Sequence, residues 1–273
     1  MAWTWLGASM AINDCPHGLV CAPGQRYHPA IIAQSIATLQ DLFGDRLWVS
    51  FGTGQAINES ITGVWPEKEF RKERLLECVD IMKRLWSGEL VNHTGRIVVQ
   101  NAKLFSNPKQ PPLLLGAALT DETADWVSGW ADGLITVASN PEDIKNKKEI
   151  FLRTESDTRP IFVKLDVAFD STKELALLGA HDQWSTNTLG SPLQAELSTP
   201  GEFEEATATV KPEDMEKFVF VCTNANGFAK LINDCFAAGA DKLIVHNVTR
   251  QQDTFLNYCK EKVFPNVHAL ARR

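Results

Sequence analysis

Residues 47–62, LWVSFGTGQAINESIT, place polar side chains directly after an apolar run. The run LWVSF predicts a strand. Gly52 and Gly54 predict a sharp turn after it, because glycine lets the backbone turn tightly and lets a ligand approach main-chain N–H groups. The polar side chains beyond the turn are Gln55, Asn58, Glu59 and Ser60. This pattern is typical of the floor of a ligand site in an α/β protein, but the GxG spacing fits equally well a turn that only joins a strand to a helix.

The composition is that of an ordinary globular protein. The chain has 273 residues, of which 44% are hydrophobic and 22% charged, enough for one large α/β domain or two small ones. A net charge of −7 argues against non-specific nucleic-acid binding, which needs a basic surface. The apolar runs are too short for a membrane span, and the first residues lack the features of a signal peptide. We therefore expect a cytoplasmic protein with a small-molecule substrate and no nucleic-acid or membrane partner.

The sequence contains none of the common hydrolytic or metal-binding motifs. GxSxG, HExxH, P-loop and paired-carboxylate patterns are absent, which leaves hydrolase, zinc-protease and NTPase functions without support. The six cysteines are scattered, with no CxxC pair and no histidine pattern nearby. We expect no metal site and no disulfide framework, and most of the cysteines should be buried thiols in a reduced compartment.

Helical and strand-like segments alternate along most of the chain. We predict strands over 18–22, 47–51, 113–117, 133–138, 161–169 and 242–248. We predict helices over 2–13, 29–43, 66–86, 120–130, 141–153, 173–184, 226–238 and 251–264. A hairpin is predicted over 90–100. The strands are apolar throughout, which is typical of a parallel sheet covered by helices.

The ends of the strands favour a barrel over an open sheet. Several strands end in small residues or possible ligand groups, as expected at the carboxyl face of a barrel, whereas the GxGxxG fingerprint is incomplete because position 57 is Ile. Six strands fall short of the eight that close a barrel, and the first element is a helix. The prediction is an α/β fold, a (β/α)8 TIM barrel lacking the first one or two βα units, as a single domain over 1–273. Residues 185–215 interrupt the rhythm and form either a lid or a peripheral insertion.

Four stretches of the sequence resemble the luciferase-like flavin or deazaflavin oxidoreductases. They are CAPGQRYHPAIIAQ, FGTGQAINESITG, RLLECVDIMKRLWSGELVNHTGR and ADGLITV. The resemblance covers nearly the whole chain and is strongest to the non-deazaflavin flavin oxidoreductase branch related to deazaflavin-dependent glucose-6-phosphate dehydrogenase. It implies a TIM barrel that binds FMN, or alternatively a deazaflavin coenzyme, at its carboxyl face. It also implies NAD(P)H as a candidate reductant and a homodimer.

The resemblance further implies which residues contact the cofactor. These are Cys21, Ala22, Pro23, Gly54, Asn58, Gly116, Ala117, Ala118, Thr136, Val137 and Ala138. Cys21 and its two neighbours would lie against the ring, and Asn58 would hydrogen-bond the ring edge. The backbone from Gly116 onward would meet the ribityl and phosphate portion, and the strand end at Thr136 would line the same side.

Four charged or ionisable residues near these positions allow more than one interpretation. Arg26 could contact a substrate anion or pair with an acidic residue, and His246 could contact substrate or be a structural histidine. His28, before a proline at a helix start, favours capping over catalysis. Glu59 could act as a substitute acid or serve only the electrostatics of a helix N-terminus.

The chain departs from the family pattern at positions that matter for catalysis. The family's GSGEALNE motif carries a glutamate that is the proposed general acid, and here that position is Gln55. An amide hydrogen-bonds but does not exchange a proton at accessible pH. The acidic–histidine pair at the end of the family's second strand has no counterpart. The sugar-phosphate lysine is replaced by Ser139 and Asn140, which argues against glucose 6-phosphate as the substrate.

Two functional hypotheses follow. The first is a flavin-dependent oxidoreductase or monooxygenase that acts on a small organic substrate, with Gln55 at the catalytic position. The alternative is a truncated or degenerate family member that acts as a non-catalytic binding or partner subunit.

Overall fold

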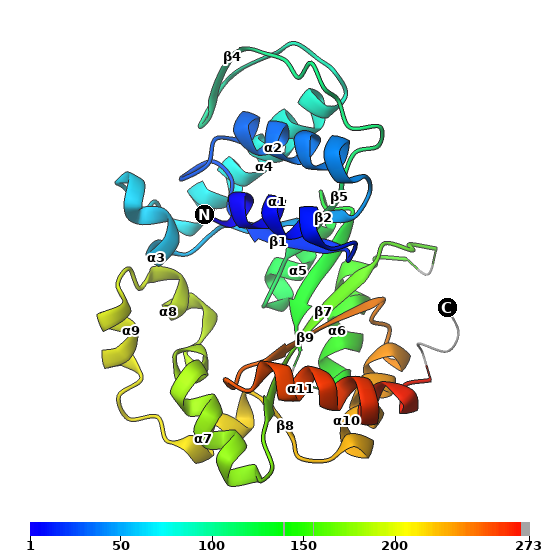
Figure 1. The fold of residues 1–273 in the computed structure, drawn as a ribbon. Coiled ribbons are helices and arrows are strands. Elements are labelled where there is room, and N and C mark those ends of the chain that lie inside the picture. Colours follow the sequence, from blue (N-terminus) through cyan, green and yellow to red (C-terminus); the bar gives the residue numbers. More distant parts are fainter. Residues whose placement is uncertain (139, 155, 269–273) are drawn as a thin grey trace. The chain divides into compact units, whose positions relative to one another are not determined.

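The computed structural model describes residues 1–138, 140–154 and 156–268 (Figure 1). These residues divide into two compact units. The first unit consists of residues 1–117 and 130–132, and the second of residues 118–129 and those from 133 onward.

The first unit contains three neighbouring strands of a parallel sheet. Its strands are β1 (His17–Cys21), β2 (Leu47–Phe51) and β5 (Leu113–Ala117), with β2 in the middle. Phe51 pairs with Cys21 on one side and with Gly116 on the other, so the carboxyl ends of the three strands are level. The parallel pairing of apolar strands confirms the α/β prediction for this part of the chain.

Helices and one hairpin complete the first unit. They are α1 (Ala2–Ile12), α2 (Pro29–Phe43), α3 (Ala56–Glu59), α4 (Lys68–Trp86), a 3-10 helix (Ser60–Thr62) and the antiparallel strands β3 (Val91–Thr94) and β4 (Val98–Ala102). Helix α2 starts at Pro29, where the missing N–H costs nothing. His28 caps this helix, because its Nδ1 accepts the Ala30 N–H at 3.2 Å. The predicted capping role of His28 is therefore confirmed.

The second unit is built around β7. Its strands are β6 (Gly133–Val137), β7 (Ile161–Phe169), β8 (Phe220–Cys222) and β9 (Lys242–Asn247), and β7 pairs in parallel with each of the others. Lys164 pairs with both Val137 and Ile244, so β6 and β9 lie on opposite edges of β7. Val167 pairs with Phe220 as well as Asn247, so β8 follows β6 along the same edge.

The helices of the second unit alternate with its strands along the chain, as the sequence predicts. They are α5 (Asp121–Ser128), α6 (Pro141–Phe151), α7 (Lys173–Trp184), α8 (Ser191–Glu196), α9 (Pro200–Ala206), α10 (Ala225–Ala237) and α11 (Gln252–Tyr258). The 3-10 helices are Ser185–Thr188, Pro212–Lys217 and Phe264–Asn266, and Cys259–Val263 is a π-helix. No helix among the described residues is long and apolar enough to cross a membrane.

The pleat of β7 sends alternate side chains to opposite faces. Phe169 lies on one face and packs against Phe255 and Tyr258 of α11, with ring centroids 5.4 and 5.0 Å away. Lys164, Asp166 and the other even-numbered residues of the strand lie on the opposite face. The two faces of this strand therefore differ sharply in chemistry.

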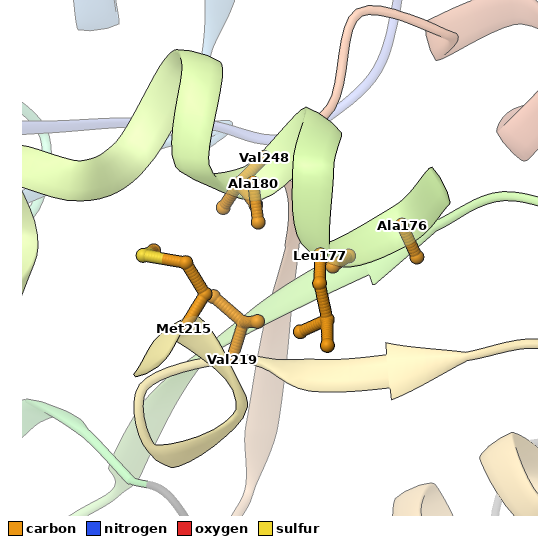
Figure 2. Packing of buried hydrophobic residues seen from close by; sticks show 7 residues of the cluster. Ala176, Leu177, Ala180, Met215, Val219 and Val248 are labelled. Carbon is orange, nitrogen blue, oxygen red and sulfur yellow. The ribbon is translucent and has the colours of Figure 1, made fainter. Parts of the chain in front are cut away.

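Helix α7 and the 3-10 helix Pro212–Lys217 cover the carboxyl end of the face that carries Asp166. They form a buried cluster with the strand ends (Figure 2). The cluster consists of Ala168, Ala176, Leu177, Ala180, Met215, Val219 and Val248. Residues 185–215, which contain only short helices, leave from α7 and return to this cluster.

Replacing Met215 with alanine should destabilise the protein, because its side chain is fully buried in this cluster. We expect the free energy of unfolding to fall by about 2–5 kcal/mol, measured by urea denaturation. Leu193 on α8 is 47% exposed, so Leu193→Ala is the matched control and should cost under about 0.5 kcal/mol. Equal losses in the two variants would contradict the packing of this segment on the strand ends.

Candidate functional site

The carboxyl ends of the strands in the first unit form a surface of small residues. Gly54 has a φ of 85°, and a Cβ added to it would lie 2.9 Å from the Cβ of Ala22. A Cβ added to Gly52 would lie 3.5 Å from the Cβ of Ala117. The loops after β1 and β2 thus approach each other so closely that only glycine fits at position 54. The Trp65 ring borders this surface, because it would lie 3.4 Å from a Cβ added to Gly54.

Two carboxamides stand beside this surface with their hydrogen-bonding capacity unused. Gln55 occupies the N-cap position of α3, but its side chain makes no capping hydrogen bond. The Asn58 side chain is exposed. Neither amide hydrogen-bonds another group in the described part of the chain. Because a primary amide both donates and accepts, each could bind the carbonyl and N–H edge of a flavin-type ring.

An ion pair between a buried carboxylate and a partly exposed guanidinium joins the two loops. Glu59, at 2% side-chain exposure, accepts the Arg26 backbone N–H at 3.1 Å and pairs with its guanidinium, Nη2 to Oε1, at 3.2 Å. Of the two interpretations of Arg26, the structure shows the pairing with an acidic residue. Removal of either partner would leave the other charge without compensation. Glu59 therefore fixes the shape of the site's floor.

Cys21, at the end of β1, is a packing residue beside this pair. Burial raises the pKa of its thiol far above the ordinary value, and the Glu59 carboxylate raises it further. A thiol that keeps its proton is a small apolar side chain and not a nucleophile. Next to it, Ala22 is buried and Pro23 forms an isolated parallel bridge with Tyr27.

The predicted contacts in the second unit are mostly engaged within the sheet. The Ala118 N–H donates to the Ile135 carbonyl at 3.0 Å, and the Ala138 N–H donates to the Lys164 carbonyl at 3.3 Å. Thr136 is buried and pairs with Val163, on the face opposite Lys164. Val137, at 39% exposure, is the accessible member of the group.

Ser139 and Asn140 occupy the place of the sugar-phosphate lysine, and the structure describes one of them. Ser139 lies outside the described residues. Asn140 caps α6, because its side-chain oxygen accepts the Asp143 N–H at 3.0 Å. The Asn140 side chain thus already has a structural role at a helix start.

A charged cluster on β7 and β9, the Asp166 cluster, was not predicted from the sequence beyond His246. It consists of Lys164, Asp166, Trp184 and His246. His246 Nδ1 and Lys164 Nζ both contact Asp166 Oδ1, at 2.8 and 2.6 Å. The Trp184 ring lies 4.6 Å from the His246 ring, edge to face, and 4.7 Å from Lys164 Nζ. The sequence signal was present: IFVKLDVAF places Lys and Asp two residues apart in an otherwise apolar strand, hence on one face.

Hydrogen bonding keeps Asp166 ionised. Burial raises the pKa of the Asp166 carboxyl, but hydrogen bonds from His246 and Lys164 outweigh burial and hold the pKa below its ordinary value. The Asp166 side chain is only 9% exposed, so the two donors compensate a charge that water reaches poorly. Among the described residues, no group of three or more His, Cys, Asp or Glu side chains could hold a metal ion.

Comparison with solved structures places this architecture among known proteins. An F420-dependent secondary alcohol dehydrogenase in complex with an F420–acetone adduct matches with a TM-score of 0.84 at 24% identity, over 98% of this chain and 84% of that one. The F420-dependent tetrahydromethanopterin reductase from Methanopyrus kandleri matches with a TM-score of 0.75 at 16% identity, over 97% of this chain and 87% of that one. The chain has an α/β fold with parallel strands that matches luciferase-like TIM-barrel proteins.

Sequence comparison shows the family. The sequence model of the luciferase-like monooxygenases matches residues 18–242, so the chain belongs to the luciferase-like monooxygenase family. The F420-dependent glucose-6-phosphate dehydrogenase of Tsukamurella paurometabola is 28% identical over 263 residues. That of Mycobacterium tuberculosis is 27% identical over 263 residues. Each alignment covers 92% of this chain and 78% of the relative.

Replacing Asp166 with asparagine should flatten the acid dependence of stability. Because the folded-state pKa lies below the unfolded value of about 3.9, the Asp166 charge stabilises the fold above that pH, and this contribution is lost as pH falls through the folded pKa. The difference in free energy of unfolding between wild type and Asp166→Asn should therefore shrink between about pH 5 and pH 2, as measured by urea denaturation at each pH. Asp253→Asn, on an exposed position of α11, is the control. A constant difference would contradict the assignment.

Proposed function

We propose that the protein is an oxidoreductase that binds a flavin-type ring at the carboxyl ends of its strands. Membership of the luciferase-like family makes it an oxidoreductase of flavin or F420 type. The observation that carries the proposal is the floor formed by Gly54 and Ala22, with the unengaged amides of Gln55 and Asn58 beside it. Small residues, main-chain groups and free amides are the chemistry that a flat, hydrogen-bonding ring requires.

The residues of the chain would bind and orient the cofactor. A bound ring of this class supplies two-electron chemistry, while the protein positions it. Cys21, Ala22 and Pro23 would contact one face of the ring, and Asn58 would hydrogen-bond its edge. Gly116 and Ala117 would allow close approach of the ribityl and phosphate portion. Three further features stay predictions: the lid role of residues 185–215, a homodimer, and NAD(P)H as reductant.

The relatives favour a deazaflavin over FMN. The glucose-6-phosphate dehydrogenases that are 27–28% identical to this chain are described as dependent on F420, the deazaflavin coenzyme. The FMN-bound Baeyer–Villiger monooxygenase from Pseudomonas putida is 18% identical and matches with a TM-score of 0.64. We therefore place F420 ahead of the FMN that the sequence resemblance favours. The reaction that agrees best with these relatives is dehydrogenation of a carbon atom that bears a hydroxyl group.

Titration of the purified protein with F420 and with FMN tests the cofactor assignment. We expect F420 to bind with a Kd in the micromolar range or below, measured by the quenching of fluorescence during the titration. Asn58→Ala should weaken it by about 3–10-fold, the value of one hydrogen bond. Asn257 is exposed on α11, so Asn257→Ala is the matched control. If a folded protein binds neither ring at micromolar concentration, the proposed function is wrong.

Gln55 supports a second candidate function, that of a non-catalytic binding subunit. The amide of Gln55 can orient a ligand but cannot act as the acid found at this position in the family pattern. This candidate predicts cofactor binding without turnover.

Replacing Gln55 with glutamate distinguishes the two candidates. If the wild type lacks activity because position 55 holds an amide, Gln55→Glu should raise cofactor-dependent turnover by about 100-fold or more. That factor is the usual contribution of a general acid or base. Gln34→Glu, at an exposed position of α2, controls for the added charge. Turnover in the wild type with no gain in Gln55→Glu would exclude the non-catalytic candidate and show that proton transfer is performed elsewhere.

A further inference from the structure

Arg74 carries a buried positive charge next to the loop that follows β1. The residue lies on α4 and is only 6% exposed, and a Cβ added to Gly24 would lie 3.0 Å from its Cγ. Its Nη1 donates to Gln25 Oε1, whereas its Nε has no hydrogen-bond partner among the described residues. Burial lowers the pKa of this guanidinium, but an arginine keeps its proton in proteins. The charge is therefore present, and water reaches it poorly.

The charge of Arg74 is only partly balanced within the first unit. The Glu59 carboxylate stabilises the charged form of Arg74 and raises its pKa. The same carboxylate pairs with the Arg26 guanidinium at 3.2 Å. Two guanidinium groups thus share one carboxylate, so these three side chains together carry a net positive charge. A buried charge without full compensation is costly for a fold, which makes this one a candidate for a functional role.

Gln25 holds Arg74 against the loops of the ring surface. Its Oε1 accepts from Arg74, and its Nε2 donates to the Val64 carbonyl at 2.9 Å and to Thr62 Oγ1 at 3.1 Å. One side-chain amide therefore connects α4 with the loop after β1 and with the segment that follows α3. The positive charge acts from a fixed position, because the groups that hold it belong to three packed elements.

The proposed ring surface lies next to these charges. Arg74 lies against Gly24, two positions after Ala22, which is expected to contact the ring. A Cβ added to Gly54 would lie 3.0 Å from Glu59 Cγ, so the shared carboxylate reaches the other side of the same surface. Charges in a buried setting are screened less than charges in water, so their effect extends beyond direct contact.

We propose that Arg74 sets the redox preference of the bound ring, because its charge stabilises the ring that has accepted a hydride relative to the oxidised ring. The proposal rests on the proposed function. A hydride carries two electrons and one proton, so the ring that accepts one gains one negative charge. A positive charge near the ring lowers the free energy of that form and raises the reduction potential. The site thereby favours hydride transfer to the ring over transfer from it.

Separate anaerobic titrations with oxidised and with reduced F420 test this role. Arg74→Met should lower the ratio of the affinity for the reduced ring to that for the oxidised ring by about 3–10-fold, as expected for one incompletely screened charge. A tenfold change in this ratio equals about 30 mV in the two-electron potential of the bound ring. Equilibration with a reference dye measures that potential independently of turnover. The same titrations with FMN cover the alternative ring.

Three further variants separate the charge of Arg74 from its packing. Arg74→Lys keeps the charge and should keep the affinity ratio within about twofold of wild type. Glu59→Gln removes the shared carboxylate, while its amide can still accept the Arg26 backbone N–H, so the ratio should rise. Arg84, near the end of α4, pairs with Glu89, and Arg84→Met should leave the ratio unchanged as the matched control. A purely structural role would weaken binding of both ring forms alike.

The outcomes separate this proposal from the proposed function. If Arg74→Met binds both ring forms with an affinity ratio within about twofold of wild type, a shift too small for an incompletely screened charge, the role of Arg74 is wrong and ring binding stands. A ratio that does not rise in Glu59→Gln also overturns the role, and this comparison decides if Arg74→Met does not fold. Failure of the folded wild type to bind F420 or FMN in either redox state overturns both proposals.

Discussion

Parallel pairing along both edges of β7 is the constraint on which the chemistry of the second unit depends. The register with β9 sets Asp166 opposite His246, and the alternation of the strand puts Lys164 on the same face. A shift of one residue would turn both charged side chains into the apolar face that packs on α11. The strand therefore holds three ionisable groups in contact and also keeps them out of the hydrophobic core.

In the first unit, the loops after β1 and β2 approach each other closely. Gly54 lies against Ala22 at a separation that leaves no room for a larger side chain. The ion pair of the buried Glu59 and the partly exposed Arg26 links the same two loops. The side-chain amides of Gln55 and Asn58 follow this turn and hydrogen-bond no other described group.

The two units carry different polar groups on their strands and strand ends. The position that carries a glutamate in the family pattern holds Gln55, whereas an ordered imidazole and carboxylate occur on β7 and β9. Gln55 can hydrogen-bond a ligand but does not exchange a proton, whereas hydrogen bonds from His246 and Lys164 hold the pKa of the Asp166 carboxyl below its ordinary value.

The sequence by itself determined the elements and the family. The strands 47–51, 113–117 and 161–169 and the helix 173–184 begin and end where the apolar patterns predict, and His28 caps its helix as expected. These features follow from local periodicity and from turn and cap residues, which need no knowledge of distant contacts. The tertiary structure decided what each polar residue does. The sequence left two interpretations of Arg26 open, and the contact with Glu59, 33 residues away, shows the ion pair. The role of Asp166 as a hydrogen-bond acceptor follows only from its contact with His246, 80 residues away. Such pairs depend on strand register and loop approach, and spacing along one chain does not encode either.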